Sequence, residues 1–268
     1  SSIKASYNRN YQYLHLLSNN TTSTPTDIWV PSSNNVKPQT ADQVALGYFR
    51  NLKDNMFELS IEGYYKSMGN LIDYRDGANI QFSTNVESEL VYGDGEAYGL
   101  EFFLKKKKGR LTGWLSYTLS RTLREFDYIN GGEAYSARQD RIHDLSIVGM
   151  YDLTDKLSVS ATWVYYTGDA VTFPSGKYEV DGQVIPYYTE RNGYRMPDYH
   201  RLDVGLNWQR KKTEKFESSW NFSLYNAYGR ENAYSIDFQQ SEANPAVTEA
   251  VQLSLFKWVP SFSYNFKF

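Results

Sequence analysis

The feature that most constrains this fold is a strict alternation of short and long connections between stretches of β-type sequence. Ten stretches alternate apolar and polar residues with the period of two typical of strands. They are residues 3–14, 40–50, 56–68, 93–105, 111–126, 141–153, 157–166, 197–209, 216–228 and 251–268. Links of roughly three to six residues alternate with long ones, which are residues 15–39, 69–92, 127–140, 167–196 and 229–250.

This alternation is typical of barrels that cross an outer membrane, where tight periplasmic turns alternate with long outward loops. A soluble β-sandwich has no reason to gather its long loops at one end. The predicted strands are also longer than the roughly five or six residues usual in soluble sheets. We therefore predict an all-β, transmembrane, antiparallel up-and-down β-barrel with ten strands in this chain and both termini on the periplasmic side.

The composition agrees with strands that are apolar on one face only. Aromatic residues make up 16% of the chain, yet its mean hydropathy is -0.60. No apolar run reaches the roughly 18 residues that a membrane helix needs. The 28 basic and 31 acidic residues nearly cancel, so nothing favours a nucleic-acid partner, and the lack of cysteine excludes disulfides and thiolate metal sites. We predict no cofactor.

The last eight residues form the clearest two-faced strand. Their apolar parity holds four rings: Phe262, Tyr264, Phe266 and Phe268. The other parity holds serine, asparagine and lysine. We predict that the rings face lipid and that this strand carries the assembly signal read by the barrel assembly machinery.

Two short units, residues 141–144 (RIHD) and 199–203 (YHRLD), each place a histidine beside arginine and aspartate. A His–Asp pair can do acid–base chemistry, but neither unit has an obvious nucleophile or third partner. We predict charges that pair along the lumen or vestibule and no enzyme activity. The candidate lumen residues are Arg141, His143, Asp144, Tyr166, His200, Arg201 and Asp203.

Several segments together resemble a known family. They are EAYGLE (96–101) running into LKKKKGRLTGWLSYTLSRTLREF (104–126), MPDYHRLDVGLNW (196–208), NAYGRENAYSI (226–236) and VPSFSYNFKF (259–268). This ordered set resembles the C-terminal half of the barrel in Bacteroidota TonB-dependent outer-membrane receptors.

The resemblance implies a 22-stranded barrel with an N-terminal plug, of which residues 1–268 are the last ten strands. It further implies a place in the cell outer membrane and import of a nutrient, with siderophore, glycan and peptide classes all open. The implied partners are outer-membrane lipids, the TonB system through a plug that this sequence lacks, and a surface lipoprotein or other envelope protein.

Two alternatives remain open at the level of sequence. One is a self-contained ten-stranded outer-membrane barrel, including a surface enzyme. The other is a receptor-fold scaffold that docks envelope proteins without transporting anything.

We predict that replacing the last ring, as in Phe268→Ala, slows assembly and lowers its yield, because the machinery then meets a strand without its terminal aromatic residue. The measurement is the folded fraction over time, followed by heat-modifiable gel mobility. Assembly at the wild-type rate and yield would remove the signal function.

Overall fold

The computed structural model describes residues 1–17, 28–75, 78, 86–181, 183–213, 216–244 and 247–268. Within them, one eleven-stranded antiparallel sheet dominates the fold. Its strands are β1 (Ser2–Gln12), β4 (Gln39–Leu52), β5 (Phe57–Tyr74), β6 (Leu90–Lys106), β7 (Leu111–Glu125), β8 (Tyr135–Ser136), β9 (His143–Thr154), β10 (Leu157–Tyr166), β15 (Tyr199–Lys212), β16 (Glu217–Tyr225) and β19 (Val259–Lys267).

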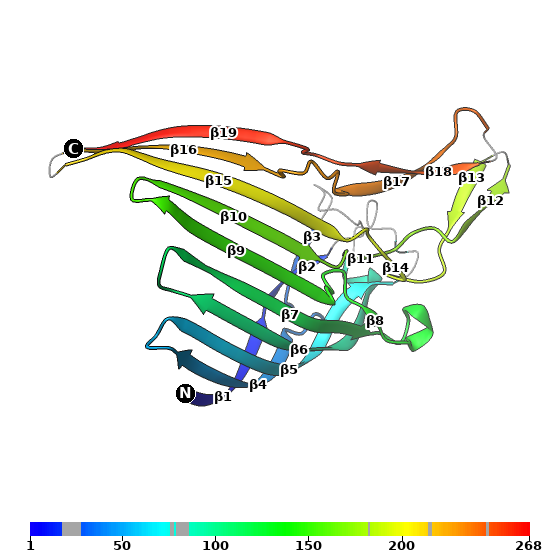
Figure 1. The fold of residues 1–268 in the computed structure, drawn as a ribbon. Coiled ribbons are helices and arrows are strands. Elements are labelled where there is room, and N and C mark those ends of the chain that lie inside the picture. The colour runs from blue at the N-terminus through cyan, green and yellow to red at the C-terminus, as the bar shows by residue number, and fades with distance from the viewer. Residues whose placement is uncertain (18–27, 76–77, 79–85, 182, 214–215, 245–246) are drawn as a thin grey trace.

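The sheet is an up-and-down wall in which strands pair in chain order. The order is β1-β4-β5-β6-β7-β9-β10-β15-β16-β19, with β8 paired to β7 off this path. Figure 1 shows both chain ends on the side of the short turns and the long connections on the opposite side. The prediction of an all-β antiparallel chain with long connections at one end is confirmed.

The long connections contain further strands, which the sequence analysis did not predict. Four two-stranded sheets pair β2 (Leu14–Leu17) with β3 (Ile28–Pro31), β11 (Ala170–Val171) with β14 (Tyr194–Arg195), β12 (Gly176–Val180) with β13 (Gln183–Tyr187), and β17 (Ser235–Gln240) with β18 (Thr248–Leu253). Two short 3-10 helices, η1 (Val86–Glu89) and η2 (Asn130–Gly132), complete the described elements. No described helix has the length and apolar character needed to cross a membrane.

Two predictions need correction. The described residues hold nineteen strands rather than ten, although ten of them make up the path of the main sheet. The predicted strand 251–268 is two elements, because its first residues complete β18 and β19 begins only at Val259. The sheet is open, since β1 and β19 are the two ends of its path and do not pair with each other. Parts of the connections 15–39, 69–92, 167–196 and 229–250 lie outside the described residues.

Strand register gives the large sheet one apolar face and one polar face. The row Leu115, Ile147, Trp163 and Leu202 crosses β7, β9, β10 and β15 on the apolar face. The neighbouring row on the polar face is Ser116, Ser146, Val164 and Arg201. Because side chains alternate along every strand, the pairing propagates this division from strand to strand wherever the register is constant.

The apolar face is exposed, and the buried apolar clusters lie at the connection end instead. Exposed large side chains on this face include Leu46, Leu100, Ile147, Phe222 and Phe262. One buried cluster joins β2, β3, β5 and β6 through Leu17, Val30, Val36, Ile72, Tyr74 and Leu90. The other joins Leu71, Val91, Phe126, Ile129 and Tyr135. The connections are thus packed like a small soluble domain, while the apolar wall lacks a covering layer among the described residues.

One glycine allows β7 and β9 to approach each other closely. Gly113 has φ of 153°, and an added Cβ would lie 2.0 Å from the carbonyl oxygen of Val148. Its pairing partner Gly149 is different, because a Cβ there would meet nothing within 4 Å.

We predict that Gly113→Ala destabilises the folded wall by ~1–3 kcal/mol, since the methyl group forces the two strands apart. Gly149→Ala in the paired position should be close to neutral and is the matched control. The measurement is the urea midpoint of unfolding in detergent micelles. Equal midpoints for the two variants would contradict the close-approach explanation.

Candidate functional site

A polar cavity lies where the long connections meet. It is a cavity of about 880 Å³. Its charged lining includes Asp73, Arg75, Arg124, Arg138, Glu190, Arg191 and Asp237. Its aromatic lining consists of Phe173, Tyr187, Tyr188 and Phe238. The mixture of guanidinium groups, carboxylates and rings suits a ligand with both charged and planar parts.

Arg191 fastens the connection after β10 to the end of β5 and to the connection after β7. Its guanidinium donates to Asp73 Oδ1 at 2.9 Å and to the carbonyl of Tyr74 at 3.1 Å. Its backbone N–H donates to Asn130 Oδ1 at 2.7 Å, and the Asn130 amide donates back to the Arg191 carbonyl at 3.1 Å. This ion pair is largely removed from water, with side chains 17% and 13% exposed.

A second arginine holds the base of the same connection. Arg195 donates to the carboxylate of Asp140, and its other donor atom reaches the Asp140 carbonyl at 2.6 Å. The Asp140 carboxylate is fully buried and also lies 3.4 Å from Arg121. The backbone N–H of Thr122 donates to it at 2.6 Å. A buried charge with this many partners positions the connection rather than offering a free ligand group.

Tyr135 completes the charge network around Asp73. Its hydroxyl donates to Asp73 Oδ2 at 3.4 Å, and Arg124 lies 3.8 Å from the same oxygen. Burial, with the nearby carboxylate of Asp73, raises the pKa of Tyr135 well above its ordinary value. The phenol therefore stays protonated and remains a donor at physiological pH.

Four predicted site residues lie on the polar face: Asp144, Tyr166, Arg201 and Asp203. Tyr166 stacks on Tyr199 with ring centres 4.6 Å apart and an angle of 4°. Arg141, which leads into β9, places its guanidinium 3.8 Å from the Tyr166 ring centre and donates to Asp169 at 3.1 Å. Because strands β9 and β15 flank β10 on opposite sides, both partners cover the Tyr166 ring, which leaves no open face for a planar ligand.

Arg201 continues this array to the next strand. Its guanidinium lies 4.1 Å from the ring centre of Tyr225 and 2.9 Å from Asp203 Oδ2. It also donates to the hydroxyls of Tyr199 and Tyr225 at 2.8 and 2.9 Å. Asp203 in turn accepts from the backbone N–H of Asn226 at 2.9 Å. The array therefore ties four neighbouring strands together at the connection end of the polar face.

The structure does not bring the two histidines into this array. His143 pairs with Leu119 and His200 pairs with Tyr165, so both lie in register with the apolar face. His143 contacts Tyr117, and His200 contacts Tyr228. Proximity in sequence was misleading here, because adjacent residues of a strand point to opposite faces.

Three of the four predicted rings, Phe262, Tyr264 and Phe266, lie on the apolar side of β19. Tyr264 pairs with Trp220 of β16, and Phe262 pairs with Phe222. Phe268 follows the strand and is 92% exposed. Their register agrees with a lipid-facing row, whereas the assembly signal stays a prediction.

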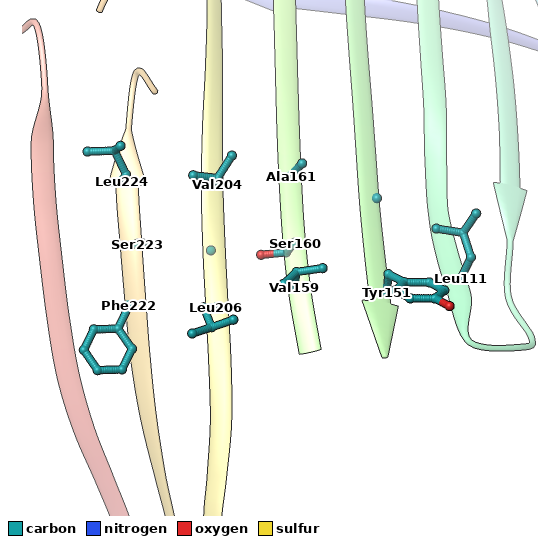
Figure 2. Close-up of a pocket in the computed structure, with 12 residues that line it drawn as sticks. Leu111, Tyr151, Val159, Ser160, Ala161, Val204, Leu206, Phe222, Ser223 and Leu224 are labelled. Atoms are coloured by element: carbon teal, nitrogen blue, oxygen red, sulfur yellow. The ribbon is translucent and has the colours of Figure 1, made fainter. Parts of the chain in front are cut away.

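A second hollow, of about 640 Å³, lies against the sheet and is lined mainly by apolar side chains. Figure 2 shows Val159 and Ala161 of β10, Val204 and Leu206 of β15, and Phe222 of β16 around it. Small residues at Gly149 and Ala161 create the depression between larger neighbours. Such a surface offers few polar groups to orient a polar solute, so the polar cavity is the better candidate site.

Sequence reasoning missed Arg191, Arg195 and Asp140. All three belong to long connections without periodicity, and their partners are far away in the chain. The one available signal was the concentration of arginine and aspartate in residues 138–141 (RQDR), which names no partner.

Comparisons with known proteins identify relatives of this arrangement. The family model described as "TonB dependent receptor-like, beta-barrel" matches residues 1–228. No curated protein matches the chain.

Similar solved structures include three receptors. The ferripyoverdine receptor of the outer membrane of Pseudomonas aeruginosa has a TM-score of 0.60 and 15% identity over 99% of this chain and 30% of its own. The ferric-catecholate import receptor Fiu of E. coli K12 has a TM-score of 0.57 and 14% identity, over 99% of this chain and 32% of its own. BauA, the ferric preacinetobactin receptor of Acinetobacter baumannii, has a TM-score of 0.54 and 13% identity, over 98% of this chain and 34% of its own. The chain therefore spans about a third of these structures, and the likeness establishes the fold.

We predict that Arg191→Met loosens the connection after β10, because Asp73 and the Tyr74 carbonyl lose a buried donor. Loss of such a bond costs ~1–3 kcal/mol, which should raise the rate of limited proteolysis within residues 172–190 by about tenfold or more. Arg210→Met, at an exposed position near the far end of β15, is the control. Unchanged cleavage in the Arg191 variant would show that the clamp does not hold this connection.

Proposed function

The chain belongs to the TonB-dependent receptor-like β-barrel family, and from that premise we propose that it forms part of an outer-membrane receptor that imports a nutrient. Besides family membership, one structural observation supports this proposal. The long connections fold together around a polar cavity at one end of a sheet whose apolar face is exposed. A wall with lipid on one side, a polar lumen on the other and a structured outward vestibule has this form.

In the proposed complete receptor, residues 1–268 are a single segment, the C-terminal ten spanning strands of a 22-stranded barrel. The open edges at β1 and β19 support this, because each presents backbone groups that a further strand must pair within a membrane. The same open edges disfavour a self-contained ten-stranded barrel. The Bacteroidota affinity rests on the sequence segments alone and stays part of the proposal.

The proposed route for substrate passes the polar cavity and then the polar face. Arg191 and Arg195 position the connection that lines the cavity. The array of Arg141, Tyr166 and Arg201 braces the wall at the lumen boundary. None of these groups is proposed to do covalent chemistry, so the assigned role is receptor and transporter rather than enzyme.

The substrate class is proposed from the relatives. Two of the similar structures are named as ferric-catecholate and ferric preacinetobactin receptors, and a third as a ferripyoverdine receptor. Ferric siderophores are therefore the first class to test, with glycans and peptides as the other two. The proposed partners are the TonB system acting on a plug, the barrel assembly machinery and a surface lipoprotein or other envelope protein.

We predict energy-dependent uptake. Cells carrying the complete receptor should accumulate one of the three nutrient classes, and deletion of the TonB system should abolish that accumulation because plug movement needs its energy. The measurement is uptake of labelled ferric siderophores, oligosaccharides and peptides in matched strains with and without the receptor gene. Receptor-dependent uptake that persists without the TonB system would contradict the proposed mechanism.

A further inference from the structure

His200 and His143 occupy an unusual position, at the connection end of the apolar face. Each ring is held through one nitrogen. The Tyr228 hydroxyl lies 2.7 Å from His200 Nδ1, and the Tyr117 hydroxyl lies 2.9 Å from His143 Nδ1. The surrounding array of Arg201 and Tyr166 uses neither histidine, because it lies on the opposite face.

One hydrogen bond joins the Tyr228 hydroxyl and His200 Nδ1, and a hydroxyl can either donate or accept in it. When the hydroxyl donates, Nδ1 is the acceptor and the neutral imidazole carries its proton on Nε2. Among the described residues Nε2 has no hydrogen-bond partner, so it presents a donor to whatever covers this face.

A guanidinium is held beside this ring. Asn232 pairs with the backbone of His200, accepting from its N–H at 3.2 Å and donating to its carbonyl at 3.0 Å. Arg230 donates through Nε to Asn232 Oδ1 at 3.1 Å and through Nη2 to the Asp198 carbonyl at 3.1 Å. The positive charge is thereby fixed next to His200 while Nη1 remains available.

Among the described residues no carboxylate forms an ion pair with Arg230. Asp198 keeps its negative charge, but its oxygens are directed to other donors, since Oδ2 accepts from the Tyr165 hydroxyl at 2.7 Å and Oδ1 accepts from the Gly168 N–H at 3.1 Å. Asp203 lies on the polar face and pairs with Arg201. The constellation therefore offers one guanidinium and one imidazole N–H above an apolar surface that continues with Trp163 and Leu202.

We propose that His200, Tyr228 and Arg230 form a binding site for the phosphate of a lipid headgroup at the outward boundary of the membrane. A guanidinium with an adjacent N–H donor matches phosphate oxygens in charge and geometry. The apolar face of the sheet continues from this site and can contact the acyl chains of a lipid, which favours a lipid over a free anion. Aromatic rings at this level, such as Trp163 and Tyr165, are typical of the headgroup region. The inference rests on the proposed function only for the orientation of the sheet in the membrane.

The test is native mass spectrometry of the complete receptor released from vesicles of equal parts phosphatidylglycerol and monogalactosyl diacylglycerol, a lipid without phosphate. The wild type should retain phosphatidylglycerol preferentially. The double variant His200→Phe with Arg230→Leu should lose about tenfold of that preference, the equivalent of one charge-assisted hydrogen bond. His200→Gln, which keeps an N–H donor, should retain part of it.

Tyr151→Phe is the matched control, because Tyr151 lies on the same face at the end with short turns. Heat-modifiable mobility establishes that each variant is folded. Equal preference in the double variant and the wild type would overturn the site. Loss of the preference on adding millimolar inorganic phosphate would overturn the choice of lipid over free anion.

The outcomes also separate this inference from the proposed function. Retention of both lipids without preference would refute the phosphate site alone. Retention of neither lipid would refute the membrane orientation on which both depend. Failure of nutrient uptake, with the lipid preference intact, would refute only the transport proposal.

Discussion

Backbone pairing between neighbouring strands is the constraint on which the rest of this structure depends. Pairing links the strands in sequence from β1 to β19, so the two-residue alternation of each strand is brought into phase with the next. The register shifts by one residue between Met68 and Leu71, beside Leu157 and between Gln209 and Lys211. Between these shifts the register is constant, and there the apolar side chains form one continuous surface. Within the described residues nothing covers that surface, and the buried clusters lie elsewhere. A hydrocarbon environment satisfies both facts, because lipid accepts the apolar face and the ladder satisfies the backbone.

The end of the sheet with the long connections is stabilised by different interactions. There the chain has no long ladder, and its order comes from small hydrophobic clusters and from charge pairs withdrawn from water. Asp73 and Asp140 each collect several donors, and each joins segments that are far apart in the sequence. Such pairs fix geometry more than they add stability, because removing the charges from water offsets much of their attraction. A polar cavity can therefore persist between connections that would otherwise collapse onto one another.

This contrast explains what could be predicted from the sequence. The spanning strands and their faces followed from periodicity, since period two is a local property that every strand displays. The limit appeared at Val251, where a β-type stretch continued into the next strand and nothing local marked the bend between β18 and β19. The hairpins inside the connections were missed for a related reason. Their strands are too short to show a two-residue period, and they form because a partner strand is present. Arg191 and Arg195 could not be assigned roles, since their carboxylate partners are identified only by the fold.

The histidines show how finely a membrane wall divides its functions. His200 and Arg201 are adjacent in the chain, yet register places one on the apolar face and the other in the polar array. Their environments differ accordingly: Tyr228 and Trp163 surround the first, and Tyr199, Tyr225 and Asp203 surround the second. A change at one position alters contacts on one face while the ladder holds the other face in place. The sheet therefore carries two surfaces with separate chemistry, because neighbouring residues of one strand contribute to opposite faces.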